Sequence, residues 1–185
     1  MPARLTTRDL VLAALFAALT AVSAWIWAPV FGVVPFTLQV LFVLMAGLVL
    51  GARLGALSML VYLTLGLFAP VYAGGTSGLG VLFGPTGGYL WGFVLAAGLV
   101  GVLATRLGRR SPIILCAIAL AGLVPIYTLG AVWLAWQVDI SLWAAARTGV
   151  LPFVPFDAVK AGVAGLTAYA LAGSPLGLLA SAQED

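Results

Sequence analysis

The chain has 185 residues, of which 64% are hydrophobic and only 7% are charged. A soluble domain carries about 25% charged residues, so this composition excludes a water-soluble globular protein and favours one embedded in lipid. The 8 lysines and arginines outnumber the 5 acidic residues, but they are scattered between apolar runs and form no basic patch for nucleic acid. Without histidine and with a single cysteine, Cys116, the chain lacks the usual ligands of zinc or haem. We therefore expect neither a metal site nor a disulfide within the chain.

Apolar runs long enough to cross a bilayer as helices recur along the sequence. They predict an all-α integral membrane protein, with residues 1–185 forming a single transmembrane domain of six helices at about 9–28, 37–50, 56–68, 85–107, 112–136 and 152–171. The second and third helices are short, so they either recruit loop residues or cross where the bilayer is thin. A cleaved signal peptide ending at Val22-Ser23-Ala24 is an alternative for the first run, but the run continues to about Pro29.

The arginines indicate the orientation of these helices. With six spans, both termini lie on one side of the membrane, together with six of the seven cations outside the spans: Arg4, Arg8, Arg53, Arg106, Arg109 and Arg110. Only Arg147 falls on the other side. Because cytoplasmic loops carry the excess of Lys and Arg, we expect both termini in the cytoplasm. The loops 30–36, 69–84 and 137–149 then lie together on the outer side.

Two opposite charges lie within the last predicted span. Asp157 and Lys160 are three residues apart, a spacing that places both side chains on one face of a helix. An ionised group near the bilayer centre costs roughly 2.5–3.5 kcal/mol on insertion scales, so such residues usually face a cavity and pair there. The pair predicts the polar floor of a binding pocket. A purely structural ion pair, or a Lys160 that extends to the headgroups, is the alternative.

The long outer loop is rich in glycine. Gly74 and Gly75 precede Thr76, and glycine allows a ligand to approach the backbone closely. The loop therefore predicts a cap over the pocket that offers backbone N–H and C=O groups, although a flexible connector would have the same composition. It is not a nucleotide-binding loop, because the GxxxxGK[ST] pattern is absent.

Other polar and aromatic side chains lie at the outer ends of the predicted helices. Gln39, one turn into an apolar helix, is costly unless it is hydrogen-bonded. Trp133 and Trp136 either form part of an interfacial aromatic belt or wall an apolar pocket. The first helix carries small residues at Ala13, Ala14, Ala17, Ala18 and Ala21. Such a stripe lets another helix approach closely, either one of this chain or one of another protein.

In their order and spacing, these segments resemble the BioY family, the biotin-capturing S components of energy-coupling factor (ECF) transporters. The resemblance covers about residues 9–170. It rests on Val-Pro-Phe-Thr-Leu-Gln at 34–39, Ala-Gly at 46–47, Gly-Ala-Arg-Leu-Gly at 51–55, Ala-Gly-Gly at 73–75, Gly-Pro-Thr-Gly-Gly-Tyr at 84–89, Gly-x-x-Trp-x-x-x-Gln at 130–137 and Pro-x-Asp-x-x-Lys-Ala at 155–161.

The resemblance implies a six-helix fold with a biotin site near the outer face. It assigns biotin contacts to Asp157, Lys160 and Thr76, and assigns docking on a membrane coupling subunit to Ala14 and Ala18. This chain departs from the family pattern where it has Phe156 before the aspartate, Thr76 in place of Asn, and Leu90 after Gly-Gly-Tyr.

We therefore expect high-affinity biotin capture and uptake across the cytoplasmic membrane of a bacterium or archaeon. Tyr89, Trp133 and Phe36 are candidate apolar walls, Asp157 can accept from a ureido N–H, and Lys160 can donate to the ureido or carboxylate oxygens. No ATP-binding motif is present, so active uptake needs a coupling subunit and two ABC-type ATPases, unless the chain acts alone. No cofactor and no enzymatic activity are expected. The alternatives are a membrane enzyme that uses Asp157 and Lys160 as an acid–base pair, and a carrier driven by proton movement through Asp157.

Overall fold

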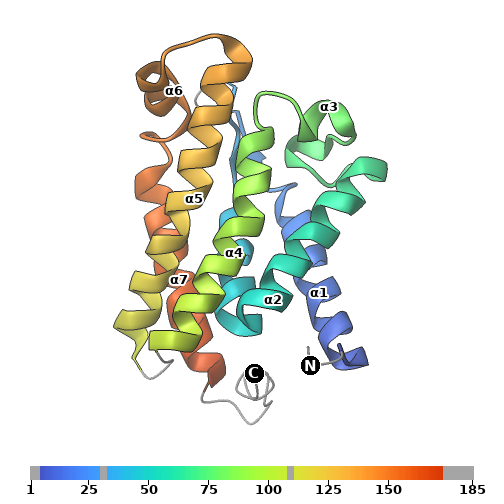
Figure 1. The fold of residues 1–185 in the computed structure, drawn as a ribbon, viewed down its shortest axis with the longest axis vertical. Helices are drawn as coiled ribbons and strands as arrows, with labels where there is room; N and C mark the ends of the chain where they lie inside the picture. Colours follow the sequence, from blue (N-terminus) through green and yellow to red (C-terminus); the bar gives the residue numbers. More distant parts are fainter. Residues whose placement is uncertain (1–4, 30–32, 108–110, 173–185) are drawn as a thin grey trace.

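The computed structural model describes residues 5–29, 33–107 and 111–172. Its elements in chain order are α1 (Thr7–Ser23), β1 (Trp27–Ala28), β2 (Phe36–Thr37), α2 (Gln39–Phe68), the 3₁₀ turn η1 (Ala73–Gly75), α3 (Leu79–Leu82), α4 (Gly87–Leu107), α5 (Pro112–Val138), α6 (Leu142–Gly149) and α7 (Val154–Ala172). The long helices stand side by side (Figure 1). We call the end that carries α3 and α6 the upper end, and the end where α1 begins and α7 finishes the lower end.

Helix α2 folds back on itself at Gly51. This residue has φ 80° and ψ −177°, a conformation that only glycine adopts readily. A Cβ on Gly55 would stand 3.0 Å from the Cα of Gly47, whereas eight residues along a straight helix would separate them by about 12 Å. One arm of α2 descends to the lower end and the other returns (Figure 1). The two arms correspond to the predicted helices 37–50 and 56–68, and the predicted turn is reduced to a sharp bend.

Several described helices are suited to a membrane. By length and composition α2, α4 and α5 could each cross one, and the α6–α7 pair, bent by 59°, makes a fourth candidate. The chain is thus a mostly helical, multi-pass membrane protein. These candidates are fewer than the six predicted spans, because α1 has only 17 residues and the two arms of α2 count as one helix.

A turn and a bend at residues 24–26 follow α1 and lead into the strand β1, so the prediction of a first helix to residue 28 is wrong. Helix α1 ends at Ser23, and β1 pairs antiparallel with β2, with Trp27 opposite Thr37. The backbone N–H of Leu38 adds a bond to the Ile26 carbonyl at 3.3 Å. An aromatic residue such as Trp27 favours an extended chain, and here β2 is available as a partner strand.

The predicted outer loops also contain helices. Loop 137–149 holds α6, whose first turn is capped by Ser141, with the Ala144 N–H donating to its hydroxyl at 3.2 Å. Loop 69–84 holds η1 and α3. A serine followed by Leu-Trp-Ala-Ala-Ala is a helix-start signal that the polar composition of the loop obscured.

Helix α1 packs on α2 through one of its two alanine stripes. Ala13, Ala17 and Ala21 are buried, whereas Ala14 and Ala18 lie on the exposed face. The structure therefore separates the small residues that serve packing within this chain from those that remain open to another helix.

The described arginines are divided between the two ends of the bundle. Arg8 lies in the first turn of α1, Arg53 follows the bend of α2, and Arg106 lies in the last turn of α4, all toward the lower end (Figure 1). Arg147 lies in α6 at the upper end. This division matches the segregation of charge on which the predicted orientation depends; Arg4, Arg109 and Arg110 lie outside the described residues.

Candidate ligand-binding site

A cavity of about 70 Å³ lies in the upper half of the bundle, where α2, α4 and α7 begin. Its walls combine apolar side chains with a small number of polar ones. They are Val34, Pro35, Thr37, Gln39, Val40, Tyr72, Ala73, Val81, Thr86, Tyr89, Leu90, Phe93, Ile126, Tyr127, Gly149, Phe153, Asp157 and Lys160. Four of the residues predicted for the site, Asp157, Lys160, Gln39 and Tyr89, are therefore brought together.

The predicted ion pair forms on the first two turns of α7. The Nζ of Lys160 lies 2.6 Å from Oδ1 of Asp157, and the two residues are only 6% and 4% exposed. The same Nζ donates to the Thr37 carbonyl and lies 4.1 Å from the centre of the Phe36 ring. A buried lysine needs such compensation for its lost hydration. Lys160 thus joins α7 to the segment that enters α2.

The second oxygen of Asp157 has its own partner. The Tyr127 hydroxyl of α5 donates to Oδ2 at 2.7 Å, so each carboxylate oxygen accepts one bond before any ligand arrives. The sequence reasoning missed Tyr127. The available signal was a tyrosine in an apolar helix, since a buried tyrosine hydroxyl usually has a hydrogen-bond partner.

Gln39 and Tyr89 line the cavity but also hold its walls. The Gln39 Nε2 donates to the Tyr62 hydroxyl, which links the two arms of α2. The Tyr89 hydroxyl donates to the Gly149 carbonyl at 2.9 Å and so fastens the α6–α7 bend to α4. Its ring lies against Gly130 of α5, where any Cβ would collide with it. The first glycine of the Gly-x-x-Trp-x-x-x-Gln motif therefore makes room for Tyr89.

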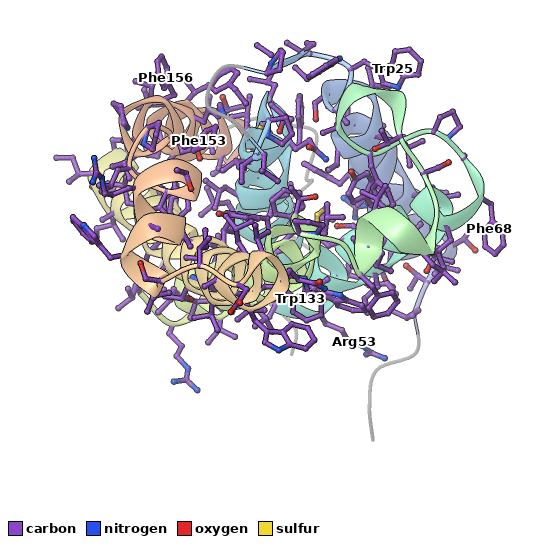
Figure 2. All side chains as sticks on the ribbon, turned by 90° about the horizontal axis from the view of Figure 1, so that it is seen from above. Trp25, Arg53, Phe68, Trp133, Phe153 and Phe156 are labelled. Atoms are coloured by element: carbon purple, nitrogen blue, oxygen red, sulfur yellow. The ribbon has the colours of Figure 1, made fainter. Side chains whose placement is uncertain are left out.

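The rest of that motif anchors a loop. The Trp133 Nε1 donates to the Gly84 carbonyl at 2.9 Å, and the Gln137 Nε2 donates to the Phe83 carbonyl. Both bonds fix the end of the α3 segment to α5. Trp133 is not among the residues that line the cavity, and Figure 2 shows it on a different side of the bundle from Phe153.

The predicted glycine-loop residues lie beside the cavity and do not line it. Gly74 and Gly75 have φ of 69° and 72°, and positions for their Cβ atoms would meet the rings of Trp27 and Trp25. Thr76 is exposed, and its hydroxyl donates to the Ala73 carbonyl at 3.0 Å. Ala73 is the member of this turn that reaches the cavity.

The cavity suits a small, mostly apolar ligand with a few N–H and C=O groups. Phe93, Ile126 and Phe153 supply apolar walls, and Thr37 and Thr86 add hydroxyls that sequence reasoning did not assign to the site. Lys160 uses two donors on Thr37 and Asp157, and an ammonium group has three. Pockets for small molecules commonly combine apolar walls with a small number of placed polar groups in this way.

Known proteins are similar to this chain in both sequence and fold. The model of the BioY family matches residues 1–174. The biotin transporter BioY of Thermotoga maritima is 44% identical over 165 residues, which are 89% of this chain and 95% of that protein. The probable biotin transporter BioY of Pyrococcus horikoshii is 45% identical over 168 residues, covering 90% and 98%.

A solved structure of the S-component for biotin from an ECF-type ABC transporter superposes with a TM-score of 0.85 at 28% identity, over 92% of this chain and 96% of that one. The family match spans nearly the whole chain, and the structural match covers 92% of it. The chain therefore belongs to the BioY family.

Proposed function

We propose that this chain captures biotin in the cavity of the upper end and is the substrate-specific component of an ECF-type vitamin importer. The observation that carries the proposal is the Asp157–Lys160 pair, buried and lining a largely apolar cavity. The relatives are named as biotin transporters, and the similar solved structure is that of an S-component for biotin. Both likenesses support biotin as the ligand.

The chemistry of biotin matches these groups. Its thiophane ring can pack on the apolar walls, and its ureido group brings two N–H donors and one oxygen acceptor. Asp157 accepts from a ureido N–H, and the remaining donor of Lys160 goes to the ureido or carboxylate oxygen. Biotin is carried and not converted, so the chain is not an enzyme and needs no cofactor.

The proposed topology has six spans with both termini in the cytoplasm. The spans are α1, the two arms of α2, α4, α5 and α7, and the upper end faces the outside of the cytoplasmic membrane. The arginines at the lower end support this orientation, since cytoplasmic loops carry the excess of positive charge. The half of the bundle that contains the cavity then faces the side from which biotin arrives.

The proposed partners are a membrane coupling subunit and two ABC-type ATPases, which alone use ATP. The exposed stripe of Ala14 and Ala18 on α1 supports close approach of another helix at that face. Operation without these partners is the alternative mode, and it uses the same biotin site.

Direct ligand analysis tests the proposal. Protein purified in detergent from biotin-fed cells is washed and denatured, and the released ligand is identified by mass spectrometry. We expect about one unmodified biotin per chain and a saturable calorimetric titration after the ligand is removed. Absence of biotin, or release of a chemically altered product, would contradict the proposal.

A further inference from the structure

A directed chain of hydrogen bonds runs from the cavity wall into the protein. Gln39 lines the cavity and is 3% exposed, and its Nε2 donates to the Tyr62 hydroxyl. Tyr62 is fully buried, lies outside the cavity lining, and donates to the Val71 carbonyl at 3.1 Å. The orientation of the Gln39 amide is thus linked to groups that do not line the cavity.

The direction of this series of hydrogen bonds follows from the number of protons that each group can donate. A tyrosine hydroxyl has one proton, and a backbone carbonyl can only accept. Tyr62 therefore gives its proton to Val71 and can only accept from Gln39, which must present Nε2 to it. If the amide were reversed, Oε1 would compete for that proton. The Val71 carbonyl would then lose its donor, which is costly where the groups are buried.

This orientation decides what Gln39 offers to the cavity. A primary amide has two N–H donors and one oxygen, and one donor is used on Tyr62. Gln39 keeps one N–H and its Oε1, which accepts no bond from the residues that the structure describes. The reversed amide would offer two donors and no acceptor. By contrast, each oxygen of Asp157 already accepts a bond.

We propose that Tyr62 is a positioning residue that makes Gln39 an acceptor for a ligand N–H. The site then selects ligands in which an N–H lies next to a C=O, as in a cyclic urea, because the Gln39 amide presents the complementary acceptor and donor. This inference rests on the proposed biotin function, in which the ureido ring supplies that edge.

The test compares biotin with two analogues in which one or the other ureido N–H is replaced by a ring oxygen. Wild-type protein should prefer biotin to both analogues, because one leaves the Gln39 acceptor unmatched and the other leaves Asp157 unmatched. The Gln39-dependent preference should be at least about 10-fold, and it is the preference that the variants below should change. In Tyr62→Phe the amide is free to turn and donate to the ring oxygen. Biotin affinity should fall by about 3- to 10-fold, the worth of one hydrogen bond, and the preference should fall toward one.

Ser58→Ala is the matched control, because it removes another buried hydroxyl of α2, which among the described residues bonds only the Gly55 carbonyl. It should leave the preference intact. If Tyr62→Phe does not fold, two variants of Gln39 decide. Gln39→Leu should abolish the preference, and Gln39→Glu, which can only accept, should retain it.

Two outcomes separate this inference from the proposed function. If both wild-type preferences persist in folded Tyr62→Phe, or in Gln39→Leu, the role of Tyr62 and Gln39 is overturned while biotin binding stands. Absence of any biotin titration in the wild-type protein overturns both.

Discussion

Two buried charged residues line the cavity, and each is compensated by groups of the protein. Asp157 and Lys160 are buried charges, and each is compensated from more than one element: Tyr127 of α5 for the acid, Thr37 before α2 for the base. Removing one partner of a buried pair leaves the other without compensation, which is more damaging than the net worth of the pair. The two residues proposed to bind the ligand therefore also hold three parts of the chain together.

Loss of either charge should weaken biotin binding strongly. We expect Asp157→Ala and Lys160→Ala each to cost roughly 2–4 kcal/mol of binding free energy, or about 30- to 1,000-fold in affinity. The double variant should lose less than the sum, because the two side chains interact directly. Titration of the monodisperse fraction of each variant measures this. Asp139→Asn, an exposed acid at the end of α5, is the control and should bind normally; wild-type affinity in folded Asp157→Ala would refute the assignment.

At the scale of elements, the bend in α2 determines how the helices pack, and the exposed alanines of α1 leave one helix face open to a partner. The bend turns one continuous helical segment into two arms that meet beside α4, where a Cβ on Gly101 would collide with the backbone of Ala52. Small residues therefore determine how the helices meet at the lower end, while larger polar side chains gather at the upper end around the cavity.

Substitution of Gly51 should destabilise the fold without changing the ligand site. Gly51→Ala forces an L side chain into φ 80° and ψ −177°, a region that costs about 1–3 kcal/mol for residues other than glycine. We expect a lower midpoint of thermal unfolding in detergent and unchanged biotin affinity in the folded fraction. Gly162→Ala is the control, since a Cβ there meets open space; an equal midpoint in both variants would show that the bend is not strained.

The exposed stripe of α1 should govern assembly and not binding. Leucine at both Ala14 and Ala18 would hold a partner helix away, so we expect loss of co-purification with the coupling subunit while biotin affinity stays normal. Ala170→Leu, at an exposed alanine of α7, is the control: it adds a leucine to another exposed helix face and should leave co-purification intact. Full recovery of the partners with the double variant would place the docking face elsewhere.

For the whole molecule, the orientation prediction follows from the division of arginines between the two ends. Reporter fusions after the C-terminus and within α6 should report opposite sides, with the C-terminal one in the cytoplasm. Alkaline phosphatase and green fluorescent protein give complementary signals for the two compartments. A C-terminal fusion that is active outside the cell would contradict the proposed topology.

The sequence predicted the parts of the fold that depend on strong local patterns. Long apolar runs gave α4, α5 and α7 to within about two residues, and two opposite charges in one apolar helix pointed to the cavity. The pairing of β1 with β2 could not be predicted, because it depends on partners eight and ten residues away and not on local propensity alone. Trp133 was interpreted as a candidate pocket wall, but the carbonyls to which it and Gln137 bond belong to a loop about 50 residues earlier. Such a long-range contact cannot be recognised from the local periodicity of the sequence.

The bond from Lys160 to the Thr37 carbonyl joins positions 123 residues apart, and this separation has a consequence for biosynthesis. The ribosome releases the N-terminal helices into the membrane long before α7 emerges, so the nascent chain contains a cavity wall with no charges in it. Only the final helix brings both ions and closes the ring of contacts with α2 and α5. We therefore expect a chain that ends before α7 not to retain biotin, so that ligand binding would report completion of synthesis.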